Sequence, residues 1–319
     1  MVRMPNEVVG PEHLCHEGLR VAVSTLTLIV MATVALAAAP EQKSFPSIEA
    51  GSTALLEAIK SNDEPALGAI LGPDGSQLIG SGDEVADTQS REAFIKAYNE
   101  AHKLVLEGDT QAILVIGKDE WPMPIPLVKS QDGWRFDTKR GAEEILNRRI
   151  GRNELNAIQV CLAIVDAERD YVAKDPDGDG IPGYAAKLVS TPGKHDGLYW
   201  ETKSEEPPSP LGPLLAAAAR DGYTNSESRS LEPYHGYFYR ILTKQGKDAA
   251  GGAHDYVVNG TMIGGFAVIA YPARYGASGI MSFIVNQDGI VYEKDLGEST
   301  EATATQMTTF NPDPSWKRP

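Results

Sequence analysis

The spacing of hydrophobic residues in two segments of the first third of the chain is helical. Residues 47–60 place Leu55, Leu56 and Ile59 three or four positions apart, and residues 91–106 repeat the same spacing. Such intervals return side chains to one face of a helix. Both segments are therefore predicted helices, the second of which includes His102.

The period then changes to two. Apolar and polar residues alternate over residues 111–117, 124–129 and 134–137, and the last two segments flank the turn residues 131–133. Alternation of this kind indicates half-buried strands. A helical stretch at 141–152 follows. Residues 40–150 are thus predicted to form an α+β domain, in which helices pack on a curved antiparallel sheet.

Residues 151–319 form a second predicted domain of the same class. Residues 153–174 carry an apolar stripe that includes Leu155, Ile158 and Val165, which predicts a long helix. An Asp-rich loop, a short helix at 184–189 and an exposed connection at 203–213 are expected next. Strands are predicted at 234–242, 262–271, 280–285 and 290–294, the last two forming a hairpin around 286–289. The fold class is α+β, with a long helix packed on an antiparallel sheet.

The segment Val21–Pro40 contains no charged residue and is rich in Val, Leu, Ile and Ala. Ala35-Leu36-Ala37 fits the small-x-small pattern that signal peptidase recognises. Residues 1–39 are therefore assigned as a signal peptide, which predicts a periplasmic or secreted protein. The alternative is an uncleaved anchor in the inner membrane, because such a length can span a bilayer.

The charge of the chain narrows the classes of partner. The 319 residues include 29 Lys and Arg against 44 Asp and Glu, which gives a net charge of −15. A chain this acidic repels phosphate backbones, so nucleic acid is excluded as a partner. The remaining partners are cations, neutral molecules, glycans and other proteins of the envelope.

Two cysteines are present, and only one lies outside the predicted leader. Cys15 precedes the apolar segment, whereas Cys161 lies on the stripe of the 153–174 helix. One cysteine cannot form an internal disulfide. We expect Cys161 to be a buried structural thiol.

Residues 175–181 (DPDGDGI) are the sharpest constellation of chemistry-bearing groups. The carboxylates of Asp175, Asp177 and Asp179 and the carbonyl oxygen of Ile181 match the first half of an EF-hand loop, a Ca²⁺ site. The match ends at Ala186, where a bidentate Glu would be expected. Two interpretations stay open, namely a calcium site of modest affinity and a solvated Asp/Gly turn.

No catalytic motif is evident in the sequence. His195, His235 and His254 show no metal-ligand spacing, and Gly276-Ala-Ser278-Gly279 lacks the G-x-S-x-G register of a nucleophile elbow. Aromatic residues cluster in the second half, at Tyr199, Trp200, Tyr223 and the segment 234–239. This cluster indicates either half-buried sheet packing or a surface that stacks on a sugar or peptide. We therefore expect a non-enzymatic binding or structural module. The alternatives are an envelope hydrolase with a dispersed site and an accessory protein of pilus or secretion machinery.

Long motifs of the chain resemble those of an uncharacterised family of exported bacterial proteins, domain of unknown function 2950. The resemblance is carried by residues 133–154, 169–200, 236–242, 259–276, 282–297 and 310–316. It covers nearly all of the chain after the leader. It implies no activity and no catalytic residue.

A weaker resemblance concerns shape. The long helix, the Asp/Gly loop and the strand FIVNQDGIVY (residues 283–292) are similar to the globular parts of type IV pilins and pseudopilins. This similarity implies a helix packed on an antiparallel sheet, with calcium in a loop in some members. The pilin helix begins at the processed N-terminus, whereas here it begins near Asn153 and carries Glu154 and Asp166. The first domain is similar to cone-shaped α+β domains of the nuclear-transport-factor type, which is an analogy of fold alone.

Overall fold

Helix α1 (Ile48–Lys60) begins where the sequence predicts it, because Ser47 caps it. The Ser47 side chain accepts a 3.2 Å hydrogen bond from the amide of Ala50, which satisfies one of the free amides of the first turn. Leu55 and Leu56 are buried on its inner face. The computed structural model describes residues 42–178, 180–203, 205–223 and 232–319. The predicted leader (Val21–Pro40) and Asp179 lie outside these residues.

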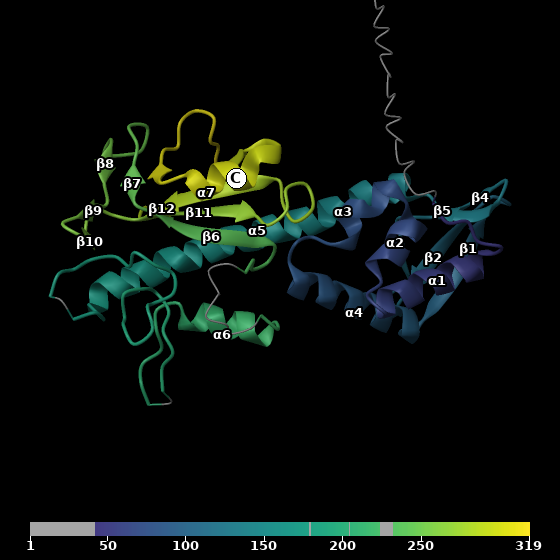
Figure 1. Ribbon diagram of the computed structural model, residues 1–319, viewed down its shortest axis with the longest axis horizontal. Helices are drawn as coiled ribbons and strands as arrows, with labels where there is room; N and C mark the ends of the chain where they lie inside the picture. The colour runs from purple at the N-terminus through teal and green to yellow at the C-terminus, as the bar shows by residue number, and fades with distance from the viewer. Residues whose placement is uncertain (1–41, 179, 204, 224–231) are drawn as a thin grey trace, which may run out of the picture. The chain divides into compact units, whose positions relative to one another are not determined.

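Residues 42–136 form a helical layer on an antiparallel sheet (Figure 1). The further helices are α2 (Glu64–Leu71), α3 (Ser76–Ile79) and α4 (Glu84–Glu100), and a 3-10 turn, η1 (Pro73–Gly75), precedes α3. The strands are β1 (His102–Glu107), β2 (Gln111–Ile116), β3 (Trp121–Pro122), β4 (Leu127–Ser130) and β5 (Gly133–Phe136). Their order is β1-β2-β4-β5, with β3 also paired to β2.

The predicted helix over 91–106 is wrong at both ends. Helix α4 begins seven residues earlier, where Asp83 caps it, and it ends at Glu100 because Ala101 has an extended backbone. His102 to Leu106 belong to β1, in which His102 pairs with Ile116. The regular ladder with β2 stabilises the strand, and tertiary pairing overrides the local helical spacing.

The two helices predicted at 141–152 and 153–174 are one helix, α5 (Thr138–Lys174). No proline interrupts the segment, and its buried side chains continue through Ile150 and Asn153. The predicted domain boundary at 150/151 therefore falls inside a helix. Leu155, which was assigned to the apolar stripe, is 68% exposed, whereas Cys161 and Val165 are buried.

Helix α5 contacts a four-stranded antiparallel sheet (Figure 1). The sheet has the order β13-β12-β11-β6. Its strands are β6 (Tyr237–Leu242), β11 (Ala267–Pro272), β12 (Met281–Asn286) and β13 (Tyr292–Asp295). Strands β12 and β13 form the predicted hairpin. Every residue of β11 is buried, so this strand lies at the centre of the core between α5 and α7 (Thr300–Gln306).

Shorter strands extend this part of the molecule. Strand β7 (Lys244–Gln245) pairs with β8 (His254–Asp255) and with β14 (Thr309–Phe310), while β9 (Val257–Val258) pairs with β10 (Thr261–Met262). A second 3-10 turn, η3 (Gly297–Ser299), precedes α7.

The segment between α5 and β6 differs most from the sequence prediction. Residues 184–189 are not a helix, since Tyr184 bridges to Met262 and Val189 bridges to Tyr199. Part of the predicted exposed connection is instead helical, because α6 (Gly212–Arg220) begins there. Proline at its second position suits the first turn of a helix.

The predicted α+β class is confirmed, and the pilin-like detail stays a prediction. Residues 39–319 form one compact unit with two hydrophobic clusters, one beneath the β1–β5 sheet and one between α5 and the β6–β13 sheet. None of the helices in the described ranges is both long and apolar enough to cross a membrane.

Candidate functional site

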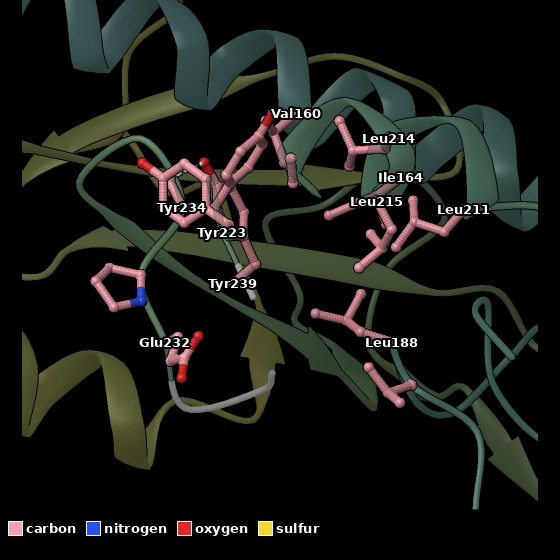
Figure 2. Close-up of a pocket in the computed structure, with 13 residues that line it drawn as sticks. Val160, Ile164, Leu188, Leu211, Leu214, Leu215, Tyr223, Glu232, Tyr234 and Tyr239 are labelled. Carbon is pink, nitrogen blue, oxygen red and sulfur yellow. Dashed lines mark hydrogen bonds between the residues drawn. The ribbon is translucent and has the colours of Figure 1, made fainter. Parts of the chain in front are cut away.

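An apolar pocket lies beside α5, between α6 and strand β6 (Figure 2). Its cavity volume is about 100 Å³. Helix α5 contributes the faces of Val160 and Ile164, and β6 contributes Tyr239. The other lining residues come from α6 and from the two connections on either side of it: Leu188, Val189, Leu211, Leu214, Leu215, Ala218, Tyr223, Glu232, Pro233 and Tyr234.

The pocket has an aromatic end and an aliphatic end. Figure 2 shows Tyr223, Tyr234 and Tyr239 grouped together, with Leu214 and Leu215 farther along the cavity. The rings of Tyr223 and Tyr234 meet edge to face, with centroids 4.9 Å apart, which is a favourable arrangement of ring quadrupoles. Ring packing therefore contributes to the shape of the aromatic end.

A tight turn positions the aromatic end. Tyr234 and Tyr237 exchange backbone hydrogen bonds of 2.8 and 3.2 Å. Between them, His235 and Gly236 both have positive φ, 53° and 78°, as the central residues of a type I′ turn do. A Cβ on Gly236 would lie 2.6 Å from the side-chain nitrogen of Asn153. Only glycine fits at that position.

The carboxylate of Asp83 holds this turn and the Tyr223 ring in place. Its Oδ2 accepts hydrogen bonds from the Tyr223 hydroxyl at 2.8 Å and from the Gly236 amide at 2.7 Å. Its Oδ1 accepts a 3.0 Å bond from the amide of Ala86 in the first turn of α4. The amide of His235 donates to the Tyr223 hydroxyl oxygen at 3.2 Å. Asp83 is 1% exposed, so its charge is offset by these donors.

Burial favours the neutral forms of the three tyrosines and of His235 at the aromatic end. Desolvation raises the pKa of Tyr223, and the nearby Asp83 carboxylate raises it further. Desolvation also raises the pKa of Tyr234 and Tyr239. The pKa of His235 is lowered by burial, although Asp221 and Asp83 act in the opposite direction. The three tyrosines thus present uncharged hydroxyl groups and ring faces, while Glu232 also lines the cavity.

The three histidines considered from the sequence lie in different settings. His195 stacks on Trp200 with centroids 4.2 Å apart, and its Nδ1 lies 3.1 Å from the Pro176 carbonyl oxygen. The ring nitrogens of His254 lie against the carbonyl oxygens of Gly252 and Gly264. Only His235 lies near the pocket, and its contact there is through its backbone and ring faces.

Of the predicted calcium ligands, Asp175 has the clearest structural role. It ends α5 in the left-handed conformation (φ 46°), and its Oδ2 accepts a 3.1 Å bond from the Gly180 amide. Asp177 and Ile181 make contacts of their own, and Asp179 lies outside the described residues. Among the residues with described positions, no group of three His, Cys, Asp or Glu side chains could hold a metal ion. The calcium loop stays a prediction.

The sequence indicated only part of the lining of the pocket. Tyr223, Tyr234 and Tyr239 were noted as members of an aromatic cluster, but Asp83 and α6 were not identified. Asp83 follows Gly82 and precedes a helix, so its capping role was readable from the sequence. Its partners Tyr223 and Gly236 are 140 and 153 positions away, which no local pattern reveals.

Comparison with known proteins identifies the family without assigning an activity. No curated protein and no solved structure is significantly similar to the chain. A family model described as "Protein of unknown function (DUF2950)" matches residues 42–318. This match covers most of the chain, and the chain therefore belongs to that family.

Proposed function

We propose that this protein is an exported binding protein of the bacterial envelope that takes a small, uncharged, mainly aromatic ligand. The observation that carries the proposal is the apolar pocket with three tyrosines at one end. Concave apolar sites with a few placed polar groups are typical of ligand-binding sites. Export is proposed from the uncharged segment Val21–Pro40.

The lining favours a ring over a sugar. Its aliphatic end offers Ile164, Leu214 and Leu215, which cannot satisfy the hydroxyl groups of a glycan, and an unsatisfied buried hydroxyl costs about 1–3 kcal/mol. The Tyr223 hydroxyl is already engaged by Asp83. The Tyr239 hydroxyl donates to the Tyr234 carbonyl oxygen at 3.3 Å. The Tyr234 hydroxyl is therefore the group that we propose to bond with the ligand.

The pocket size limits the ligand to about one ring. An engineered protein cavity of about 150 Å³ holds benzene, and this pocket is of the same order, at about 100 Å³. The lining supplies no thiol and no serine, so the described lining residues favour binding over nucleophilic hydrolysis.

The test uses p-cresol, a neutral single-ring probe, in titration calorimetry with the full chain. The parent protein is expected to bind it, and Tyr234→Phe is expected to bind about fivefold more weakly through loss of one hydrogen bond. Ala218→Phe fills the pocket and should abolish binding, whereas Ala216→Phe alters an exposed residue of the same helix and should not. Thermal melts establish that each variant is folded.

Two results would overturn the binding proposal. One is the absence of p-cresol binding by the folded parent protein at millimolar concentrations. The other is equal binding by the Ala218→Phe and Ala216→Phe variants. Export is tested separately by the intact mass of the protein purified from its native cells. A mass that retains Val21–Pro40 would replace the cleaved signal with the anchor.

A further inference from the structure

A second pocket, of about 170 Å³, lies between the helices and the sheet of residues 42–149. Its body is apolar, with Leu78, Phe94, Met123 and Ile125 among the lining residues. Its lining also includes three charged residues, namely Asp87 and Arg91 on α4 and Arg149 on α5. They are unusual there, because apolar cavities seldom include charged groups.

Neither arginine is neutralised by a close carboxylate. Arg149 donates to the carbonyl oxygens of Gln77 and Leu78 at 3.0 and 2.9 Å. Arg91, whose side chain is 18% exposed, donates to the Ile79 carbonyl oxygen at 3.2 Å. Within the described ranges, Arg149 has no ion pair within 4.0 Å, and Arg91 has one at that limit, with the exposed Glu64.

The surroundings add positive charge. Arg274 donates to the Gly80 carbonyl oxygen at 3.0 Å, so a third guanidinium binds the same short stretch of backbone. Burial lowers the pKa of Arg149, and the charges of Arg152, Arg91 and Arg274 lower it further, while Asp87 acts in the opposite direction. The Asp87 carboxylate is itself engaged, since its Oδ2 accepts a 2.7 Å bond from the Ser81 amide.

Positive charge therefore outweighs negative charge in its action on Arg149. The charges of Arg91, Arg152 and Arg274 oppose that of the single carboxylate of Asp87, in a chain whose net charge is −15. A partly buried cation without a counter-charge is unfavourable, and a bound anion offsets that penalty. Arginine is also suited to carboxylates, because its planar fork can donate two parallel hydrogen bonds.

We propose that this pocket binds a small organic carboxylate, with the carboxylate at Arg91 and Arg149 and a ring-sized apolar body against Phe94 and Met123. An inorganic anion would leave the apolar lining unused. A cavity of this volume is close to the one of about 150 Å³ that holds benzene. The site is separate from the tyrosine pocket and does not depend on it.

The experiment compares three probes that have nearly the same shape but differ in charge. Benzoate, benzamide and benzamidine are titrated into the full chain by calorimetry at fixed ionic strength, with sulfate as an inorganic anion. Benzoate is expected to bind at least tenfold more tightly than benzamide, sulfate more weakly than benzoate, and benzamidine not measurably. The Ala218→Phe variant, in which the tyrosine pocket is filled, should bind benzoate as the parent does.

Matched variants test whether benzoate binding depends on the arginines of this pocket. Arg91→Gln is expected to weaken benzoate binding at least tenfold and to leave benzamide binding within about twofold. Arg148→Gln removes one positive charge from the position before Arg149 on α5, where the side chain is exposed and paired with Glu144. This variant should change the affinity for benzoate less than twofold. Arg149→Lys is used in place of a neutral substitution, because loss of the positive charge at Arg149 could unfold the protein. It should lower the affinity for benzoate, because lysine cannot donate two parallel hydrogen bonds as the guanidinium group does.

Several outcomes would overturn the proposal. Equal affinities for benzoate and benzamide would remove the role of charge. Equal losses in Arg91→Gln and Arg148→Gln would reduce the effect to general electrostatics. Loss of benzoate binding in Ala218→Phe would place the probe in the tyrosine pocket instead.

Discussion

The hydroxyl of Tyr223 donates a 2.8 Å hydrogen bond to Asp83, a residue 140 positions earlier in the chain. The same carboxylate caps α4 through Ala86 and accepts the amide of Gly236. One buried side chain thus links the first turn of α4 to both the aromatic end of the pocket and the start of β6. The pocket geometry therefore depends on a residue that does not line it.

Replacing Asp83 should destabilise the fold far more than removing a helix cap. Asp63 caps α2 by the same kind of bond, from Ala66 at 2.9 Å, but it is exposed. Asp63→Ala is expected to cost about 1 kcal/mol. Asp83→Ala is expected to cost about 3 kcal/mol or more, because it also leaves two buried donors unpaired. Urea unfolding of the two variants measures the difference, and equal losses would contradict the linking role.

Glu168 should make the protein less stable as the pH rises. It is fully buried on α5, its Oε2 accepts a 2.8 Å bond from the Ala185 amide, and its Oε1 has no partner among the described residues. Burial raises its pKa to about 8, well above the unfolded value of about 4.3. Between these values the folded state holds a proton that the unfolded state lacks. Stability from this group is full below pH about 4.3 and falls by up to about 1.4 kcal/mol per pH unit until pH about 8.

The Glu168→Gln variant isolates this effect. It should be more stable than the parent at pH 8, and the difference should shrink as the pH is lowered to 5. Other groups, such as His235 with its lowered pKa, contribute equally to both proteins and cancel in the difference. Glu144→Gln, an exposed change on the same helix, should show no such trend. Parallel pH profiles for the parent and Glu168→Gln would refute the prediction.

Elements fixed by local rules were predictable from the sequence. Ser47 caps α1, and the turn before Gly289 joins β12 to β13 in the expected hairpin. The burial of Cys161 followed from helical spacing alone. In each case the residues that decide the structure are close neighbours in sequence.

Elements fixed by distant partners were not predictable. Residues 102–106 have helical spacing but form β1, because β2 offers six paired positions. Helical spacing assigned Leu155 to the core, but its side chain is exposed. Spacing alone does not reveal whether another element packs on a given residue. Asp83 and Tyr223 meet only in the folded protein, so the sequence showed the cluster of tyrosines but not the pocket that they line.

Cys161 should be unreactive and should matter for stability alone. The side chain is fully buried, and desolvation raises its thiol pKa to about 12, so almost no thiolate forms at neutral pH. Cys161→Ser should cost about 1–3 kcal/mol by burying an unpaired hydroxyl, while p-cresol binding persists in the folded variant. Peptide mapping after mild alkylation of the native protein distinguishes Cys161 from Cys15. Rapid labelling of Cys161 would contradict its burial.

The Asp-rich loop yields the last prediction, that millimolar calcium stabilises the protein. Asp175 has one buried carboxylate oxygen, Oδ1, that lacks a hydrogen-bond partner in the described chain, and its Oδ2 already organises the loop through Gly180. Calcium accepts irregular sets of oxygen ligands, whereas magnesium demands a tight octahedron.

Because Ala186 cannot close the site, the expected dissociation constant is that of extracellular calcium modules, about 10⁻⁴–10⁻³ M. At about 10 mM free calcium, such a site stabilises the folded state by about 1.4–2.7 kcal/mol. Thermal melts in calcium and in magnesium measure this gain. The double replacement Asp177→Asn with Asp179→Asn should abolish it. The control replacement Asp166→Asn with Asp170→Asn removes two exposed charges from α5 and should retain the calcium-dependent gain. A retained gain would show that the loop itself, and not general relief of negative charge, is the cause. Equal melting temperatures of the parent protein with and without calcium would reduce the loop to a solvated turn.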